Sequence, residues 1–343
     1  MRAATYHGAR TIVLDERPPP APPGPGQIQI AVAYTGICGT DLHIFHGDMD
    51  ARVQPPTVIG HEMSGRIAAL GAGTTGWEIG APVTVMPTRS CGGCAACRRG
   101  LAHICHRLDF IGIDSPGAMQ SLWTVPADLV IALPRGLPLE FATLAEPAAV
   151  AVHDVRRARV TGDDFVVVVG GGPVGLLIAA VATREGARVL VVEPDPFRRS
   201  VSMQIGIEAI DPRHHDVSAF VADRTDGAGA DVAFEVSGAT DGVTTAVDVL
   251  TTRGRLIMVA IHPKPREVNL HRFFWRELEL LGARLYERSD FEEAVGLVAE
   301  GAIPAKQLIS RVQPFEDVAA AFEALESRGG VMKVLVDCRD GVR

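Results

Sequence analysis

The feature that most constrains the fold of this chain is a glycine-rich turn near its middle. Four consecutive valines come before the turn, and an apolar run without charged residues follows it. Gly170, Gly172 and Gly175 give the turn the pattern G-x-G-x-x-G. Apolar runs of this length on either side of a turn predict a buried strand and then a buried helix. We therefore expect a strand over Phe165–Val169 and a helix over Val174–Ala182.

The residues of this turn have clear tasks if the turn binds a dinucleotide. Gly170 permits the sharp turn, and Gly172 lets the backbone approach a pyrophosphate at the N-terminus of the helix. Pro173 and Val174 lie at that N-terminus, and Gly175 lets the helix lie close to the sheet. A plain glycine-rich loop in an α/β core is the alternative. The strand, the helix and a later acidic residue together favour the dinucleotide site.

That acidic residue is Glu193, which ends the next expected strand. A carboxylate here accepts hydrogen bonds from both hydroxyls of a ribose and repels a 2′-phosphate, which favours NAD over NADP. Arg198 and Arg199 follow shortly after and could serve a phosphate if the loop turned. We expect them instead to stack on the adenine or to remain solvated, so NAD is the predicted cofactor.

The rest of the chain shows two different patterns of apolar residues. A helix is expected over Glu146–Ala158. After it, strands alternate with helical stretches, which predicts a parallel sheet covered on both faces. The expected strands are Phe165–Val169, Arg188–Glu193, Asp231–Val236 and Arg255–Ile261. Earlier in the chain, Gln27–Ala33 alternates with period two, and residues 57–86 hold short apolar runs separated by glycines. The first third is therefore predicted to be a barrel-like, mainly β unit, and the whole chain α/β.

Four cysteines form the strongest local motif, with the spacing C-x2-C-x2-C-x7-C. They are Cys91, Cys94, Cys97 and Cys105. Four thiolates at such spacing suit a tetrahedral zinc ion, and because protein fills every position the zinc would be structural. Disulfides are the alternative, which the lack of a secretory signal disfavours. His103 and His106 beside the last cysteine are expected to be solvated.

A second cluster of reactive side chains begins at Cys38 and continues at His61 and Glu62. A thiolate and an imidazole suit Zn²⁺, and a catalytic zinc takes three protein ligands so that one position stays open for water or substrate. The third ligand is Glu62 or Glu146, and the residues alone leave both open. Cys38 and His61 could each be core packing if they stood alone. Their clustering argues for a metal.

Polar residues that follow Cys38 suggest a path for a proton. Thr40 could hydrogen-bond an oxygen on the metal, and His43 could carry the proton from that hydroxyl to solvent. His46 is a rival for the second role, but it lies one helical turn further on. Asp41 is expected to hold a ligand imidazole in one tautomer.

Composition narrows the classes of function. The 343 residues allow two domains, and 33 basic against 41 acidic residues give a net charge of -8, which disfavours nucleic acid or an anionic membrane as partner. No N-terminal signal peptide is apparent, so the cytoplasm is expected. The uncharged run Phe165–Ala182 approaches the length of a membrane span, but its glycine turn would leave backbone groups unpaired in lipid.

In combination, these motifs resemble the zinc-dependent medium-chain alcohol dehydrogenase family almost from end to end. The resemblance is carried by Gly36–His43, Gly60–Glu62, the four cysteines, Glu146–Pro147 and the Gly170 turn. Glu146 stands where classical alcohol dehydrogenases have a cysteine. In this respect the chain is similar to the polyol branch, which includes sorbitol, butanediol and threonine dehydrogenases.

The resemblance implies a GroES-like catalytic domain over 1–148 and 284–343, interrupted by a Rossmann NAD-binding domain over 149–283. It also implies two zinc ions per chain and a homo-oligomer, either a dimer or a tetramer. The implied substrate is a small-molecule secondary alcohol, a polyol or vicinal diol, which gives a ketone as its hydride passes to NAD.

The resemblance also implies roles for the residues of the second cluster. Cys38, His61 and Glu146 would hold the catalytic zinc, with Glu62 adjacent and able to exchange with water. The proton of the alcohol would leave through Thr40 and His43. Three aromatic residues are candidates to line the substrate pocket: Phe110, Trp123 and Trp275.

The sequence leaves three other functions open. Activity on L-threonine would need an acidic partner for the substrate ammonium group, and none can be assigned. A zinc-free quinone reductase on the same fold would not need Cys38, His61 and Glu146 together. A non-catalytic NAD-binding protein should show a broken ligand set, whereas this one is intact.

Overall fold

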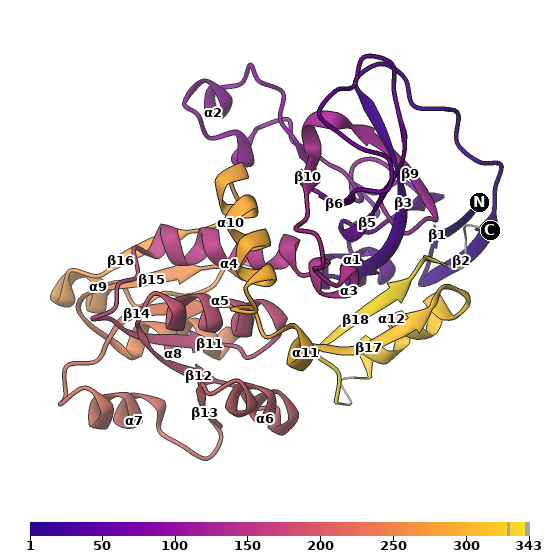
Figure 1. The fold of residues 1–343 in the computed structure, drawn as a ribbon. Helices are drawn as coiled ribbons and strands as arrows, with labels where there is room; N and C mark the ends of the chain where they lie inside the picture. Colours follow the sequence, from indigo (N-terminus) through magenta and orange to yellow (C-terminus); the bar gives the residue numbers. More distant parts are fainter. Residues whose placement is uncertain (328–329, 340–343) are drawn as a thin grey trace. The chain divides into compact units, whose positions relative to one another are not determined.

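The computed structural model describes residues 1–327 and 330–339, which form two compact units (Figure 1). The first unit comprises Met1–Glu146, Glu287–Ala299 and the described residues from 309 onward, and the second comprises Pro147–Tyr286 and Glu300–Leu308. Residues 300–308 group with the second unit, whereas the predicted domain limits place them in the catalytic domain. Those limits remain a prediction.

The first unit is mainly β, as predicted. Its largest sheet, among the described residues, runs in the order β10, β6, β5, β3, β18 and β17, and β9 also pairs with β3. The strands are β10 (Val130–Ala132), β6 (Pro82–Val85), β5 (Glu62–Leu70), β3 (Gln27–Gly36), β18 (Lys333–Asp337), β17 (Ile309–Pro314) and β9 (Leu122–Pro126). Figure 1 shows yellow β18 beside indigo β3, so strands from early and late in the sequence pair within one sheet.

Two smaller sheets and several short helices complete this unit. One sheet orders β2 (Thr11–Glu16), β1 (Arg2–Gly8) and β4 (Thr57–Val58), and the other pairs β7 (Thr88–Arg89) with β8 (Asp109–Phe110). The helices are α1 (Gly39–Phe45), α2 (Ala95–Arg98), α3 (Leu139–Ala142), α10 (Arg288–Ala299) and α12 (Val318–Glu326), with short 3₁₀ turns at η1 (Ala102–Ile104), η2 (Ala127–Leu129) and η3 (Phe315–Asp317). Helix α1 directly follows β3 and carries much of the candidate site.

The second unit is built on a parallel sheet with the strand order β13, β12, β11, β14, β15 and β16. The strands are β13 (Glu208–Ile210), β12 (Arg188–Val192), β11 (Phe165–Val169), β14 (Ala230–Glu235), β15 (Leu250–Met258) and β16 (Glu279–Gly282). In chain order this is 3-2-1-4-5-6, the doubly wound arrangement whose direction reverses between β11 and β14. The predicted parallel sheet is confirmed.

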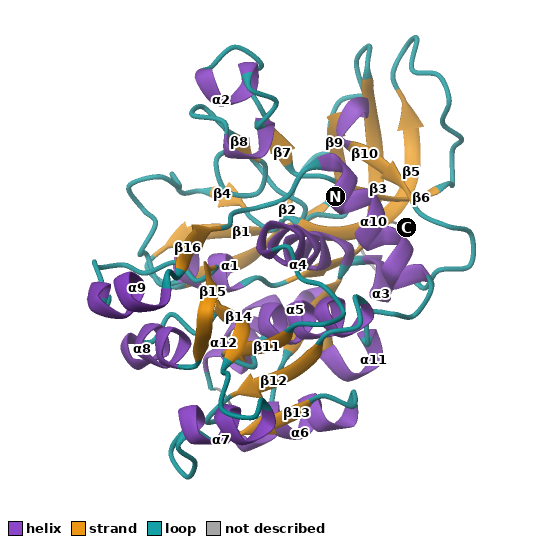
Figure 2. Ribbon diagram, turned by 90° about the vertical axis from the view of Figure 1, so that its left-hand side faces the viewer, coloured by secondary structure: helices purple, strands orange, loops and turns teal. Residues whose placement is uncertain are grey.

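Helices cover both faces of this parallel sheet, with α5 and α8 on opposite sides (Figure 2). They are α4 (Ala145–Ala158), which begins in the first unit, α5 (Pro173–Arg184), α6 (Pro196–Gln204), α7 (Val217–Arg224), α8 (Thr240–Asp248), α9 (Leu270–Arg276) and α11 (Ala305–Leu308). Fully buried aliphatic residues of β11, β12, β14 and β15 form the core between them. Double coverage explains why these strands are continuous apolar runs.

Several predicted strand ends differ from the structure, and β15 differs most. The strand expected over Arg255–Ile261 is β15, which begins at Leu250 and ends at Met258. It stops early because the amides of Val259 and Ala260 both donate to the carbonyl of Glu235, which turns the chain back toward the end of β14. Apolar residues continue past that point, so the sequence pattern does not mark the end of the ladder.

Helix α4 contains an uncompensated acid, Asp154. Its side chain is fully buried, and neither carboxyl oxygen has a hydrogen-bond partner among the described residues. Burial raises the pKa of Asp154 well above its ordinary 3.8. The folded protein therefore retains a proton that the unfolded chain releases above pH 3.8, and stability falls as the pH rises toward the raised pKa.

We expect Asp154→Leu to raise the free energy of unfolding at neutral pH by about 1–3 kcal/mol, because an apolar side chain of similar size removes the buried acid. Asp154→Asn should flatten the pH dependence while keeping a polar group in place. The measurement is the thermal midpoint of each variant between pH 5 and 8.5. An Asp154→Asn protein with the pH dependence of the parent would show that this carboxyl does not titrate as proposed.

None of the helices within residues 1–327 and 330–339 combines the length and apolar character that crossing a membrane requires. The uncharged run Phe165–Ala182 forms β11, the glycine turn and most of α5.

Candidate active site and metal centres

Cys38 lies at the junction between β3 and α1. It is the N-cap residue of α1 and has an extended backbone, with φ -86° and ψ 159°. Its amide donates a hydrogen bond of 2.8 Å to Oδ2 of Asp41 in the first turn of the helix. This local bond fixes the end of the strand relative to the helix, so that the thiol is held by backbone geometry.

His61 and Glu62 reach the thiol through the pairing of β3 with β5, in which Gly36 is the partner of Glu62. The ligand atoms of Cys38, His61 and Glu62 all lie within 4.8 Å of one another. His61 and Glu62 are almost fully buried, and Cys38 is half-buried. The structure thus brings together three of the residues that the sequence selected. Cys38 follows the end of β3, and His61 and Glu62 lie at the start of the neighbouring β5.

The imidazole of His61 is surrounded by groups that favour its charged form. Nδ1 lies 3.6 Å from Oδ1 of Asp41, and neither atom has a hydrogen-bond partner among the described residues. Burial alone lowers the pKa of His61, but the Asp41 carboxylate and the Cys38 side chain outweigh it and raise this pKa well above the usual value. The rings of Phe110 and His61 are nearly perpendicular, with a centroid distance of 5.0 Å. Asp41 thus faces the predicted ligand imidazole, at more than hydrogen-bond length.

Glu62 has a partner that the sequence did not suggest. Lys333, at the start of β18, places its ammonium group 2.7 Å from each carboxylate oxygen of Glu62 and donates a third bond of 3.1 Å to the carbonyl of Ile37. Lys333 is 3 % exposed and Glu62 is 1 % exposed, so the pair is sealed from solvent. All three ammonium hydrogens are used, which holds the Glu62 carboxylate in one orientation.

Glu146 lies in the first turn of α4 and is buried. Its charge contributes to raising the pKa of both His61 and Lys333, which places it in the same electrostatic environment as the cluster. Burial lowers the pKa of Lys333, but the negative charges around it, chiefly that of Glu62, outweigh burial and raise this pKa above its usual value. Two carboxylates, one thiol and one imidazole therefore interact electrostatically in one largely buried region.

This donor set fits a zinc ion. A thiolate, an imidazole and a carboxylate are the ligand types of catalytic zinc, and a bound cation would offset the negative charge gathered here. The buried Nδ1 of His61 and Oδ1 of Asp41 lack partners but face each other, the arrangement that orients an imidazole whose other nitrogen is a ligand.

The predicted proton path is only partly assembled. Thr40 and His43 are three residues apart on α1, so their side chains share one face of the helix. Thr40 is half-buried, whereas His43 is exposed, with Nδ1 3.1 Å from Oδ2 of Asp48. Among the described residues they do not hydrogen-bond to each other. The rival His46 is paired with Glu326 at the surface.

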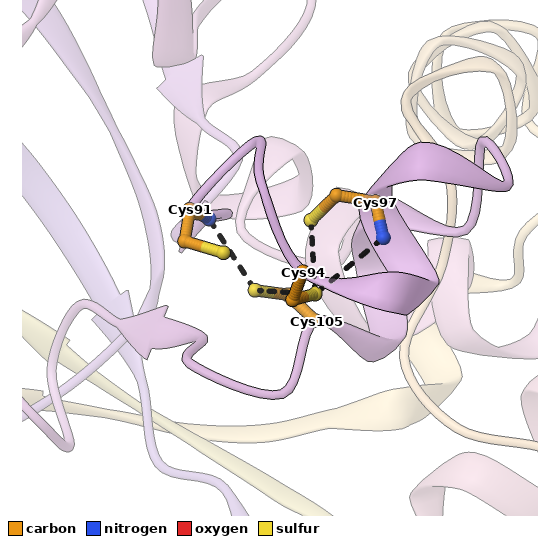
Figure 3. Close-up of side chains that lie close together, drawn as sticks. All are labelled: Cys91, Cys94, Cys97 and Cys105. Atoms are coloured by element: carbon orange, nitrogen blue, oxygen red, sulfur yellow. Dashed lines mark hydrogen bonds between the residues drawn. The ribbon is translucent and has the colours of Figure 1, made fainter.

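The four predicted structural ligands converge in the lobe around α2 (Figure 3). Sγ of Cys94 lies 3.5 Å from Sγ of Cys97 and 3.8 Å from Sγ of Cys105, and Cys91 completes the group. A tetrahedral ion with Zn–S bonds of about 2.3 Å places its sulfurs roughly 3.8 Å apart. All six cysteines of the chain are free thiols, so the disulfide alternative is not supported.

Donors around these sulfurs favour thiolates. Backbone amides and the Arg107 guanidinium lower the pKa of Cys91 to about 6, and the amides of Cys97 and His106 lower that of Cys94 to about 7. Burial and the neighbouring sulfurs raise the pKa of Cys97 to about 11, as expected where thiols compete for negative charge that a cation would neutralise. His103 is buried at 8 % exposure, so its expected solvation was wrong.

The glycine turn has the geometry that its pattern predicts. Gly170 has φ +109°, and a Cβ there would lie 2.9 Å from the backbone of Ser237. A Cβ on Gly175 would lie 1.9 Å from the carbonyl oxygen of Gly170, so only glycine lets α5 approach the turn this closely. Gly172 caps α5, and the nearest atom to a Cβ there is Nη1 of Arg198 at 3.7 Å. The main-chain amides at the start of α5 are therefore accessible to an anion.

Glu193 follows β12 directly and is buried beside this turn. Oε2 accepts a 2.7 Å hydrogen bond from the amide of Gly171, and Oε1 accepts one of 2.8 Å from the amide of Asp195. Nη1 of Arg198 lies 3.8 Å from the same carboxylate. Glu193 therefore stabilises the turn, a role that the sequence did not reveal, in addition to the predicted contact with a ribose.

Comparison with known proteins decides the family. Residues 24–135 match the alcohol dehydrogenase GroES-like domain, and residues 173–300 match the zinc-binding dehydrogenase domain. A protein of Pseudoalteromonas atlantica named 2-dehydro-3-deoxy-L-galactonate 5-dehydrogenase is 46% identical over 98% of this chain and 99% of its own length. The chain belongs to the zinc-dependent alcohol dehydrogenase family.

Other members support the same placement. Sorbitol dehydrogenase of Halalkalibacterium halodurans is 33% identical over 97% of each chain. An alcohol dehydrogenase structure from E. coli in complex with NADH superposes with a TM-score of 0.91 at 26% identity, over 98% of this chain and 99% of that one. As a zinc-dependent alcohol dehydrogenase related to polyol and sugar-acid enzymes, the chain is an oxidoreductase that acts on CH–OH groups, and the resemblance to the polyol branch is confirmed.

Residues outside the predicted set also shape the site of this alcohol dehydrogenase. Lys333 was missed, although a single lysine inside the apolar run Val331–Val336 is a signal for a buried charge that needs a partner. Of the aromatic candidates, Phe110 contacts His61, but Trp123 is buried in β9 and Trp275 is exposed on α9. Aromatic residues alone therefore did not identify a pocket.

Proposed function

We propose that this chain oxidises a secondary hydroxyl of a polyhydroxylated substrate, a polyol or a sugar acid, to a ketone and transfers the hydride to NAD. The observation that carries the proposal is the cluster of Cys38, His61 and Glu62 in one unit, which also contains the buried Glu146. The second support is the glycine turn with Glu193 beside it in the other unit.

Cys38, His61 and Glu146 would hold the zinc ion, which supplies Lewis acidity to the substrate oxygen when bound. Glu146 is the preferred carboxylate ligand because both oxygens of Glu62 already accept hydrogen bonds from Lys333. Asp41 orients the imidazole of His61, and Lys333 holds Glu62 beside the ligands. The four cysteines around α2 would hold a second, structural zinc.

The chain's own residues would also move the proton of the alcohol. Thr40 is placed to accept it on the half-buried side of α1, and His43, on the same face, carries it to solvent at the exposed side. An exposed imidazole suits proton exchange with bulk water.

The choice of NAD rests on Glu193. Its carboxylate is fixed by two backbone amides, so a 2′-phosphate brought to the same place would meet a negative charge that cannot turn away. Arg198 lies between Glu193 and Gly172, where it can contact an adenosine or a phosphate.

Reduction of NAD at 340 nm, followed against a panel of substrates, tests the proposal. The panel contains 2-dehydro-3-deoxy-L-galactonate, sorbitol, 2,3-butanediol, a simple secondary alcohol and L-threonine, each with NAD or NADP. Substrates with several hydroxyls should turn over with NAD, and a zinc chelator should remove the activity. Turnover only of L-threonine, or activity that resists complete metal removal, would contradict the proposal.

We further propose that the protein is a homo-oligomer, a dimer or a tetramer, and that β16 lies at an interface. Strand β16 is an edge strand of the parallel sheet, and Leu280 on it is exposed. The adjacent α9 exposes Leu270, Phe274 and Trp275. A second copy related by two-fold symmetry would pair with this edge and cover the apolar side chains.

Phe274→Glu combined with Trp275→Glu is expected to shift the protein to a smaller species, because two charges would be buried at the interface. Sedimentation velocity measures the change in mass. Ile79→Glu is the matched control, since Ile79 is an equally exposed apolar residue in the first unit. An unchanged mass in the double variant would place the interface elsewhere.

The location and the excluded partners remain predictions. We expect the protein to act in the cytoplasm on a small molecule, without nucleic acid or a membrane as partner. The net charge of -8 disfavours nucleic acid and an anionic membrane as partners.

A further inference from the structure

A buried carboxylate at the end of β14 organises the loop that follows β15. Glu235 is fully buried, and its Oε1 accepts hydrogen bonds from the amides of Ser237 and Gly238 at 3.0 and 3.1 Å, and also from the Ser237 hydroxyl. Its Oε2 lies 2.9 Å from Nε2 of His262. The carboxylate is therefore saturated with partners and acts as a rigid anchor.

His262 links Glu235 to Arg266 through a second hydrogen bond. Nε of Arg266 donates a 3.1 Å hydrogen bond to Nδ1 of His262. Because an arginine nitrogen can only donate, Nδ1 must be the acceptor and Nε2 must carry the proton that Glu235 accepts. The hydrogen bonds that link Glu235, His262 and Arg266 thus fix the guanidinium group through its Nε edge. Within the described residues, the two terminal nitrogens of Arg266 have no hydrogen-bond partner.

The position of these three hydrogen-bonded residues relative to the sheet indicates what the terminal nitrogens of Arg266 would contact. Ser237 lies against Gly170 of the glycine turn, and a Cβ on Gly242 would lie 2.3 Å from the Ser237 hydroxyl and 2.7 Å from Glu235 Oε1. The cluster therefore sits directly across the reversal point between β11 and β14. In a doubly wound sheet a dinucleotide lies across this point at the carboxyl ends of the strands, with one nucleotide on each half.

Glu193 belongs to the half formed by β11, β12 and β13, which takes the adenosine ribose. The other half, formed by β14, β15 and β16, is left for the nicotinamide nucleotide. We propose that Arg266, positioned by His262 and Glu235, binds a phosphate oxygen on the nicotinamide side of the cofactor. The inference rests on the proposed use of a nicotinamide dinucleotide and gives roles to three residues outside the sequence motifs.

A purely structural role would explain less of the arrangement. The His262–Glu235 hydrogen bond alone would fasten the loop after β15 to the end of β14. The second hydrogen bond, from Arg266 to His262, is not needed for that purpose. It holds in place a half-buried cation whose terminal nitrogens have no partner among the described residues, and such a cation suits a phosphate oxygen. Lys264 and Arg266 are two positive residues of the same loop, but only Arg266 is held in place by other side chains among the described residues.

The test measures the affinity of the purified zinc-loaded protein for NADH and for AMP, which contains only the adenine half. Arg266→Gln should weaken NADH binding by about 10-fold to 100-fold, the effect of losing a hydrogen bond to a charged group, and should leave AMP binding unchanged. Lys264→Gln is the matched control, because it removes the same charge from the same loop, and should leave both affinities unchanged. Arg266→Lys should recover part of the NADH affinity.

His262→Ala tests the positioning role. Its effect on NADH binding should overlap with that of Arg266→Gln, so the double variant should lose less than the product of the two single losses. Equal losses for NADH and AMP would mean that the loop is merely destabilised, and would overturn the proposal. So would unchanged NADH affinity, or a higher KM for an acidic substrate at unchanged NADH affinity, which would assign Arg266 to the substrate. A parent protein that fails to bind NADH would refute the proposed cofactor instead.

Discussion

Cys38→Ser is expected to lower kcat/KM by about a thousandfold or more while leaving NADH affinity within about twofold. A Lewis-acidic zinc contributes several kcal/mol to stabilising developing negative charge, and each 1.36 kcal/mol corresponds to a factor of ten in rate. The serine hydroxyl is a much poorer zinc ligand than the thiolate. NADH should still bind, because the glycine turn and Glu193 lie in the other unit.

Metal analysis gives this experiment a second readout. The zinc content should fall from two ions to one per chain, since the four cysteines around α2 are untouched. Cys338→Ser is the matched control: Cys338 is a buried cysteine at the end of β18 whose Sγ lies 3.8 Å from Oγ1 of Thr35, and its replacement should keep both zinc ions. Full activity of Cys38→Ser, with one zinc lost, would refute the catalytic zinc.

Lys333→Met is expected to destabilise the protein by about 3–5 kcal/mol, because removing one partner of a buried ion pair leaves the other charge without compensation. Glu62 is 1 % exposed, so water cannot replace the ammonium group without opening the sheet. The free energy of unfolding of the first unit, followed with urea, measures the loss. The released Glu62 carboxylate should also become available to metal, which would appear as a changed visible spectrum of the cobalt-substituted protein.

Two companion variants separate charge from packing. Lys333→Arg keeps the charge and should retain most of the stability, whereas Glu62→Met with Lys333→Met removes both charges and should be close to neutral for stability. A double variant as unstable as Lys333→Met would show that the packing of the lysine stem, and not its charge, determines the loss.

Local motifs allowed much of the fold and of the site to be predicted. The glycine turn and the four cysteines are short segments whose spacing already specifies their geometry, and the structure matches both. Cys38 and His61 were recognised because the ligand chemistry of zinc restricts residue types. Their actual proximity depends on the register between β3 and β5, which no local pattern determines.

Features that depend on distant partners could not be predicted. Lys333 meets Glu62 only because the end of the chain returns beside β3, and the Glu235–His262 pair joins segments that follow two different strands. Asp154 has no pattern around it that would mark a buried acid on α4. In each case the sequence shows a charge among apolar residues, but not whether another charge will face it.

The two amides held by Glu193 have a practical consequence for engineering. Changing the cofactor preference of such enzymes from NAD to NADP would ordinarily begin by replacing this acid with a neutral or basic residue. Here that exchange would also release the amides of Gly171 and Asp195, so the glycine turn would lose its support before any new phosphate contact was gained. A redesigned chain would therefore need a second substitution that restrains the loop, and single substitutions at this position should yield poor enzymes with either nucleotide.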